Sequence, residues 1–168
     1  KKPEYKAINP KGKVAALVRH DGSVLTEFSA IAMWLSMTYP DKRLMPTDSE
    51  GIVRTIEMLD FIVGTVHMLS WRMWRRPDAY SDDPTGQELL RMRGKTAMLN
   101  ALDLVDTHLI GKDYLMGEFS VADAALYYNE FWAVDVAGWN LPKNVQAHYE
   151  RMKTRPSVQS SREIEGVT

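Results

Sequence analysis

The sequence predicts a mostly helical α+β protein, in which a short β-hairpin near the N-terminus is followed by helices. Two observations predict this fold class. The apolar run from Val14 to Val18 is followed by Asp21-Gly22 and a second short apolar run, a pattern typical of a hairpin. From residue 49 onward, apolar residues recur at intervals of three and four, which is the period of a helix.

Composition indicates a packed globular protein and excludes several classes of site. The chain has 168 residues, of which 45% are hydrophobic and 26% charged. The 21 basic and 22 acidic residues leave a net charge of -1, which argues against nucleic acid and anionic membranes as partners. The absence of cysteine excludes a disulfide framework, a cysteine-ligated zinc and a thiol nucleophile in this chain. No run free of charged residues approaches the roughly 20 apolar residues of a membrane helix, so no membrane partner is expected.

The predicted hairpin needs other structure beside it. Its first strand, Val14 to Val18, is apolar at every position, which indicates a strand covered on both faces. An isolated hairpin is only marginally stable in water, so we expect a larger sheet around it. A helix is predicted to follow from Thr26, as its N-cap, to Met37. The two prolines between Tyr39 and Asp48 then mark a linker.

Five further helices are predicted after the linker. The first runs from about Ser49 to about Arg75, and the second from about Pro84 to Leu109, where Gly111 ends it. Ser120 and Asp123 form a capping box that opens the third, and we interpret this box as purely structural. Pro142 begins the fourth, and Arg155-Pro156 separates it from a short last helix.

Several short segments, taken in order, resemble one known family. They are Asn9-Pro10-Lys11-Gly12, Asp21-Gly22, Leu25-Thr26-Glu27, Phe119-Ser120-Val121-Ala122-Asp123 and Arg155-Pro156-Ser157-Val158. The chain resembles a bacterial glutathione transferase, closest to the beta class. The resemblance implies that residues 1–39 are the C-terminal part, or remnant, of a thioredoxin-like glutathione-binding domain. Residues 40–48 would then be the linker, and residues 49–168 the all-helical C-terminal domain.

The same resemblance implies an activity and its cosubstrate. Members conjugate the thiolate of glutathione to an apolar or aromatic electrophile, and we expect a cytoplasmic homodimer with a role in detoxification. The resemblance also implies that the first part of the thioredoxin-like domain, with the catalytic Tyr, Ser or Cys, is missing from this chain. No residue here is therefore assigned that role, and no metal is expected, because His20, His108 and His148 have no metal-ligand spacing.

Four residues of the first unit are expected to hold glutathione. Glu27 lies where an acid would receive the γ-glutamyl ammonium, and the N–H groups of Phe28 and Ser29 would face the carboxylate. Val14 matches the position whose main chain pairs with the cysteinyl part of glutathione. Glu27 could instead only offset the helix dipole.

The sequence departs from the family pattern beside these residues. Ala15 replaces the cis-proline of the family, and we expect the Val14–Ala15 bond to be trans. Phe28 stands where most classes have Ser or Thr, so a side-chain hydroxyl contact is lost.

The first long helix offers a second group of candidates. Asp60, Gly64, His67, Trp71 and Trp74 follow helical steps and so are predicted to share one face. By resemblance, His67 is an auxiliary catalytic residue that also borders the electrophile pocket, and Asp60 contacts the glutathione of the partner subunit. Trp71 and Trp74 would wall that pocket. The alternatives are that His67 is a hydrogen-bonded bystander and that both tryptophans only pack.

Two other functions remain open at this point. The first is a non-catalytic glutathione transferase-like scaffold that binds proteins, which Ala15 and Phe28 favour. The second is a self-sufficient helical binding module, which requires the chain to fold cooperatively by itself.

Overall fold

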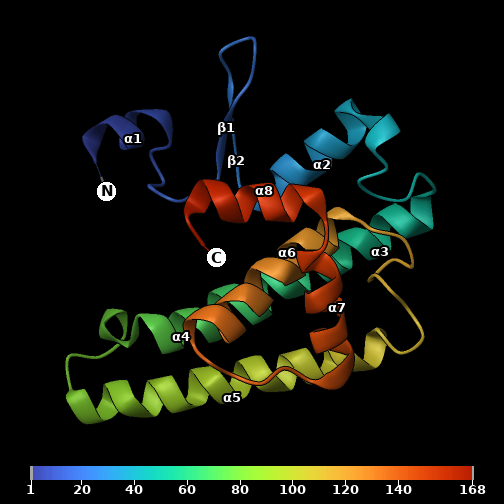
Figure 1. Ribbon diagram of the computed structural model, residues 1–168. Helices are drawn as coiled ribbons and strands as arrows, with labels where there is room; N and C mark the ends of the chain where they lie inside the picture. The colour runs from blue at the N-terminus through green and yellow to red at the C-terminus, as the bar shows by residue number, and fades with distance from the viewer. Residues whose placement is uncertain (1, 168) are drawn as a thin grey trace.

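The computed structural model describes residues 2–167 as a small hairpin unit joined to a larger helical part (Figure 1). Strands β1 (Ala16–Val18) and β2 (Val24–Thr26) pair antiparallel, with Leu17 opposite Leu25. Helix α1 (Pro3–Ile8) precedes the hairpin and α2 (Phe28–Thr38) follows it. In Figure 1 these elements occupy the upper side of the molecule, and α3 to α7 lie below them.

The helical part confirms the mostly helical fold class. Its first helical segment is continuous and consists of α3 (Ser49–Asp60), a π-helix η2 (Phe61–Trp71) and α4 (Arg72–Arg75). The following long helices are α5 (Pro84–His108), α6 (Val121–Phe131), α7 (Lys143–Lys153) and α8 (Pro156–Glu165). Three short elements lie between the longer helices. The first, η1 (Pro40–Lys42), precedes α3; η3 (Pro77–Ala79) lies between α4 and α5; and η4 (Trp132–Val136) follows α6. No helix within residues 2–167 combines the length and apolar character needed to cross a membrane.

The helix starts follow local capping chemistry. The predicted box at α6 is present: the Ser120 hydroxyl accepts from the helix N-terminus, and the Asp123 carboxylate accepts from the Ser120 N–H at 2.7 Å. Asp48 caps α3 by accepting from the Gly51 N–H at 2.9 Å. The predicted N-cap of α2, Thr26, is wrong by one residue: Glu27 holds the N-cap position, and Thr26 is the last residue of β2, where it pairs with Ala16.

The hairpin differs from its predicted environment in two respects. Within residues 2–167 the sheet has two strands only, and Val14 and Val18 are 78% and 56% exposed. The expected coverage of both faces is thus not present in the described part of the chain. The Val14–Ala15 bond is cis, so the expectation of a trans bond is wrong. That expectation rested on the local preference of a non-proline bond, which the tertiary structure overrides here.

One hydrophobic core joins the two units. Leu59, Ile62, Leu102 and Leu126 are fully buried in it, and Ala32 of α2 belongs to the same cluster. The Val121 N–H at the start of α6 donates to the Leu44 carbonyl at 2.8 Å. Helix α2 and the segment after it are therefore held against the helices that carry the rest of the candidate site.

Candidate functional site

Glu27 lies at the N-cap position of α2, on an exposed surface. Its backbone has φ 71°, which is uncommon for a residue other than glycine and often marks a functional position. Its side chain does not cap the helix, so the carboxylate is directed elsewhere. The Glu27 Oε1 atom lies 2.7 Å from the Lys11 Nζ atom, and Lys11 also donates to the Thr26 hydroxyl at 3.0 Å. An acid, a cation and the N-terminus of a helix thus come together.

Lys11 was missed by the sequence analysis. The signal was available, because Lys11 lies inside the Asn9-Pro10-Lys11-Gly12 segment on which the resemblance depends. The structure adds it to the candidate site through its ion pair with Glu27.

The main chain before β1 is ordered by Asn9. This side chain is buried, donates to the Lys13 carbonyl at 2.6 Å and accepts from the Lys11 N–H at 3.2 Å. The Tyr5 hydroxyl donates to the same Lys13 carbonyl. Val14 follows at once, outside β1, and is 78% exposed. Phe28 begins α2 and is 38% exposed.

The π-helix η2 alters the face that the sequence predicted for residues 60–74. Its hydrogen bonds span five residues, so side chains depart from the helical period used in the prediction. Asp60 ends α3 in an exposed position, and His67 is half-buried. Trp71 is 5% exposed, with its ring centre 4.7 Å from that of Trp74 and 5.2 Å from that of Trp132. The structure therefore places Trp71 in the core, the alternative considered for it.

His67 has a defined tautomer. The Asn129 amide nitrogen donates to the Ala125 carbonyl at 2.9 Å, so the Asn129 Oδ1 atom is left as the acceptor for His67. The His67 Nδ1 atom lies 3.2 Å from that oxygen and must carry the proton. Burial lowers the pKa of His67, and the Asn129 contact opposes this only in part. The neutral ring leaves the Nε2 atom with a lone pair that can accept a proton or a hydrogen bond.

A cavity of about 420 Å³ lies between α6 and α8, and His67 is not among its lining residues. The ring of Tyr128, which lines this cavity, is centred 5.3 Å from the His67 ring. The lining is largely aromatic and includes Phe119, Tyr127, Tyr128, Phe131 and Trp132. The sequence signal for this cavity was the group of aromatic residues Tyr127, Tyr128, Phe131 and Trp132, which was missed because Asn129 and Glu130 interrupt it.

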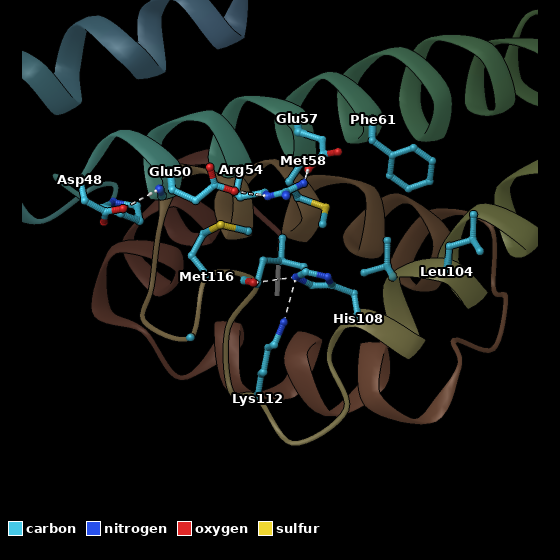
Figure 2. Close-up of a pocket in the computed structure, with 15 residues that line it drawn as sticks. Asp48, Glu50, Arg54, Glu57, Met58, Phe61, Leu104, His108, Lys112 and Met116 are labelled. Carbon is cyan, nitrogen blue, oxygen red and sulfur yellow. Dashed lines mark hydrogen bonds and ion pairs between the residues drawn. The ribbon is translucent and has the colours of Figure 1, made fainter.

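A wider groove of about 890 Å³ lies between α3 and the end of α5, and Figure 2 shows its lining. None of the predicted site residues lines it. Its charges are largely paired, because Arg54 lies 2.8 Å from Glu50 and 3.0 Å from Glu57. Across residues 2–167, no group of three His, Asp or Glu side chains is arranged to hold a metal ion.

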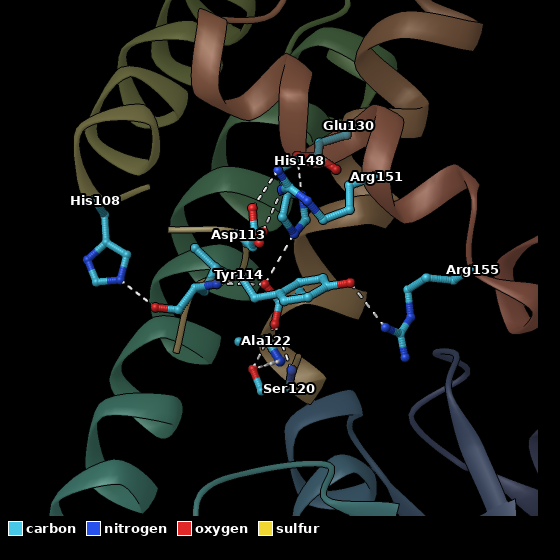
Figure 3. A network of polar contacts seen from close by, with 11 residues as sticks. His108, Asp113, Tyr114, Ser120, Ala122, Glu130, His148, Arg151 and Arg155 are labelled. Carbon is cyan, nitrogen blue, oxygen red and sulfur yellow. Dashed lines mark hydrogen bonds and ion pairs between the residues drawn. The ribbon is translucent and has the colours of Figure 1, made fainter. Parts of the chain in front are cut away.

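A buried polar network connects α6 and α7 (Figure 3). The His148 Nε2 atom lies 3.1 Å from Asp123 Oδ1, and its Nδ1 atom lies 2.8 Å from Glu130 Oε1. Asp123 Oδ1 also accepts from the Leu115 N–H at 2.8 Å. All three ionisable side chains are fully buried, so they hold the helices together and do not reach a ligand.

Comparison with known proteins identifies the family. The "Glutathione S-transferase GstA" of Escherichia coli O157:H7 is 33% identical over 168 residues, which cover 98% of this chain and 79% of that protein. The chain belongs to the glutathione S-transferase family. The profile of the "Glutathione S-transferase, N-terminal domain" matches residues 1–38.

Solved structures of the family agree with this assignment. A glutathione transferase homologue from Sulfitobacter with bound glutathione superposes with a TM-score of 0.86 at 26% identity, covering 99% of this chain and 80% of that one. The bacterial beta class glutathione S-transferase of Sphingomonas chungbukensis superposes with a TM-score of 0.82 at 31% identity, covering 98% and 79%. This confirms the beta-class-like resemblance that the ordered segments indicated.

The candidate residues lie in both domains of the glutathione S-transferase fold. Val14, Glu27 and Phe28 lie within the stretch that matches the thioredoxin-like N-terminal domain. Asp60 and His67 lie in the helical C-terminal domain, as does the cavity between α6 and α8.

Proposed function

We propose that this protein uses glutathione as cosubstrate and conjugates its thiolate to an apolar or aromatic electrophile in the cytoplasm. The single observation that carries the proposal is the Glu27–Lys11 pair at the N-terminus of α2. Glutathione is a zwitterionic peptide, and its ammonium and carboxylates require both signs of charge close together. Membership of the glutathione S-transferase family and the glutathione bound in the Sulfitobacter homologue support the same assignment.

In this proposal, Glu27 receives the γ-glutamyl ammonium, and the Phe28 and Ser29 N–H groups receive the adjoining carboxylate. Lys11 binds a carboxylate of the peptide, and the exposed main chain of Val14 pairs with its cysteinyl part. The Lys11–Glu27 ion pair does not oppose binding, because a pair exposed to this extent contributes only about 0–1 kcal/mol.

The electrophile binds in the cavity between α6 and α8, whose volume of about 420 Å³ suits a small organic molecule. Neutral His67 packs against Tyr128, a residue of the cavity wall, and we assign its Nε2 lone pair the role of orienting or polarising the reactants. Trp71 and Trp74 support the wall of the cavity without lining it. Trp71 packs against Trp132, which lines the cavity.

The protein further acts as a homodimer in which Asp60 contacts the glutathione of the partner subunit. Its exposed position at the end of α3 supports this role. Val53 and Ile56 on the same helix are exposed apolar residues, which supports an interface on α3. Sedimentation of the protein with Val53→Glu is expected to show loss of the dimer.

The residue that activates the thiolate is proposed to lie in a part of the N-terminal domain outside these 168 residues. The sheet within residues 2–167 has two strands and leaves Val14 and Val18 exposed, which supports this proposal. The division of the chain at residues 40–48 remains a prediction.

Calorimetric titration of the full-length protein with glutathione tests the proposal. We expect saturable binding, and we expect Glu27→Gln to weaken it about tenfold or more, because a charge-assisted contact is lost. Glu50→Gln is the matched control, since Glu50 is also an exposed, ion-paired acid near the start of a helix. Absence of saturable binding would overturn the proposal and favour the non-catalytic scaffold.

A further inference from the structure

We propose that the cavity between α6 and α8 selects electrophiles that carry a carboxylate on an aromatic body, and that Arg155 determines this specificity. The inference rests on the proposed function and names the substrate class of its electrophile site.

The aromatic lining defines the body of the ligand. Phe119 lines the cavity from the segment before α6, and Tyr128 and Trp132 line it from neighbouring turns of α6 and η4. The Tyr128 and Trp132 rings meet edge to face, with centres 5.8 Å apart. Flat aromatic surfaces of this kind favour a flat ligand over an aliphatic one of equal volume.

Arg155 contributes an unbalanced positive charge to the same cavity. Its guanidinium carbon lies 3.6 Å from the centre of the Phe119 ring, and its Nη1 atom lies 3.3 Å from the Tyr114 hydroxyl (Figure 3). Its Nε atom is buried and has no acceptor among the described residues. None of the ion pairs within residues 2–167 includes Arg155, whereas a guanidinium is suited to bind a carboxylate.

A second unpaired donor lines the cavity. The indole Nε1 atom of Trp132 is also buried and has no acceptor in the described part of the chain. A buried N–H group is normally hydrogen-bonded, so two such groups on one cavity indicate that an acceptor is supplied from outside the chain. A carboxylate offers several lone pairs to these donors, whereas an unsubstituted hydrocarbon ring offers none.

The other charged residues of the lining do not alter this conclusion. Arg162 is already paired, with its Nη2 atom 3.2 Å from Asp135 and its Nη1 atom 3.1 Å from the Tyr127 hydroxyl. Glu165 is the only acid among the lining residues, and it is exposed to solvent. Arg155 is therefore the lining cation left to receive an anionic ligand.

The turnover test uses a matched pair of electrophiles, a chloronitrobenzoate and the chloronitrobenzamide of the same substitution pattern. In both reactions the glutathione thiolate forms a C–S bond at the ring, the C–Cl bond breaks, and chloride leaves with the bonding electrons. For the full-length protein, we expect kcat/KM to be at least about tenfold higher for the benzoate. Arg155→Met is expected to remove this preference, so that the ratio of kcat/KM for the benzoate to kcat/KM for the benzamide falls to about one.

Arg151→Met is the control, because Arg151 of α7 also lies over the Tyr114 ring but does not line the cavity. It is expected to keep the preference for the benzoate. If Arg155→Met does not fold, Arg155→Lys serves instead, and a preference reduced at least about threefold is expected, because lysine lacks the Nε donor.

Binding without glutathione separates this inference from the proposed function. Naphthoate and naphthamide are titrated into the protein, and we expect naphthoate to bind at least about tenfold more tightly. Equal affinities, or a preference that survives Arg155→Met, would overturn the inference even if glutathione binds normally. Naphthoate preference without glutathione binding would instead overturn the proposed function and leave the cavity assignment standing.

Discussion

The Nδ1 atom of His148 on α7 lies 2.8 Å from the Oε1 atom of Glu130 on α6, and both side chains are fully buried. The other ring nitrogen faces Asp123, so one imidazole links two carboxylates inside the helical domain. Burial disfavours the imidazolium, but the hydrogen bonds to Asp123 and Glu130 outweigh it and raise the pKa of His148 to about 9. Burial also raises the pKa of Glu130 to about 7, although His148 opposes the shift.

We predict that the folded protein loses stability as the pH rises from about 5 to about 9. The unfolded chain releases the Glu130 proton near its ordinary pKa of 4.5 and the His148 proton near 6.5, whereas the folded protein holds them to about 7 and about 9. The folded state therefore binds more protons across this window, and the free energy of unfolding decreases with pH. Urea unfolding at a series of pH values measures this slope. Glu130→Gln is expected to flatten it below pH 7, and a rise in stability from pH 5 to pH 9 would contradict the prediction.

We predict that His148→Leu destabilises the protein by about 3–5 kcal/mol, because it leaves two buried carboxylates without their cation. The double variant His148→Leu with Glu130→Leu is expected to lose less than His148→Leu alone. Asp123 then keeps its contacts with Ser120 and Leu115, and no second acid is left unpaired. Chemical denaturation of both variants tests this order, and equal losses would show that the pair is not coupled.

Local features of the fold were predictable because they depend on neighbouring residues. The turn at Asp21-Gly22 forms as predicted, with the Ser23 N–H donating to the Asp21 side chain at 2.9 Å. The capping box at Ser120 and the long helical segment from Ser49 to Arg75 are also confirmed. Each rests on capping or periodicity that is complete within a few turns of chain.

Long-range features were not predictable in the same way. The π-helix between Phe61 and Trp71 interrupts the helical period from which the shared face of residues 60–74 was predicted. No local residue pattern predicts a π-helix there. His148 is 18 residues from Glu130 and 25 from Asp123, so its partners are determined by the packing of α7 on α6. The cavity lined by Arg155 and Trp132 likewise requires α8 to be placed against α6.

We predict that Gly94→Ala destabilises the protein by several kcal/mol. A Cβ atom on Gly94 of α5 would lie 2.7 Å from both the Ser70 carbonyl oxygen and the Trp74 backbone nitrogen, so the helices would have to separate. Gly64→Ala is the matched control, because no atom lies within 4 Å of its added Cβ and alanine is the better helix former. Thermal unfolding is expected to show a lower Tm for the first variant and an unchanged or higher Tm for the second. A similar Tm for both variants would contradict the close approach.

We predict that His67 titrates below the ordinary histidine pKa of about 6.5, because burial disfavours its charged form. The Asn129 contact opposes this effect, so Asn129→Ala is expected to lower the pKa of His67 further and to release the proton from its fixed position on the Nδ1 atom. NMR of the imidazole nitrogens measures both the titration and the tautomer. Glu57→Ala serves as the control, because it removes an exposed acid that is paired with Arg54. A pKa of His67 above the ordinary value, or an Nε2–H tautomer in the unmodified protein, would remove the basis for its proposed role as a neutral acceptor beside the cavity.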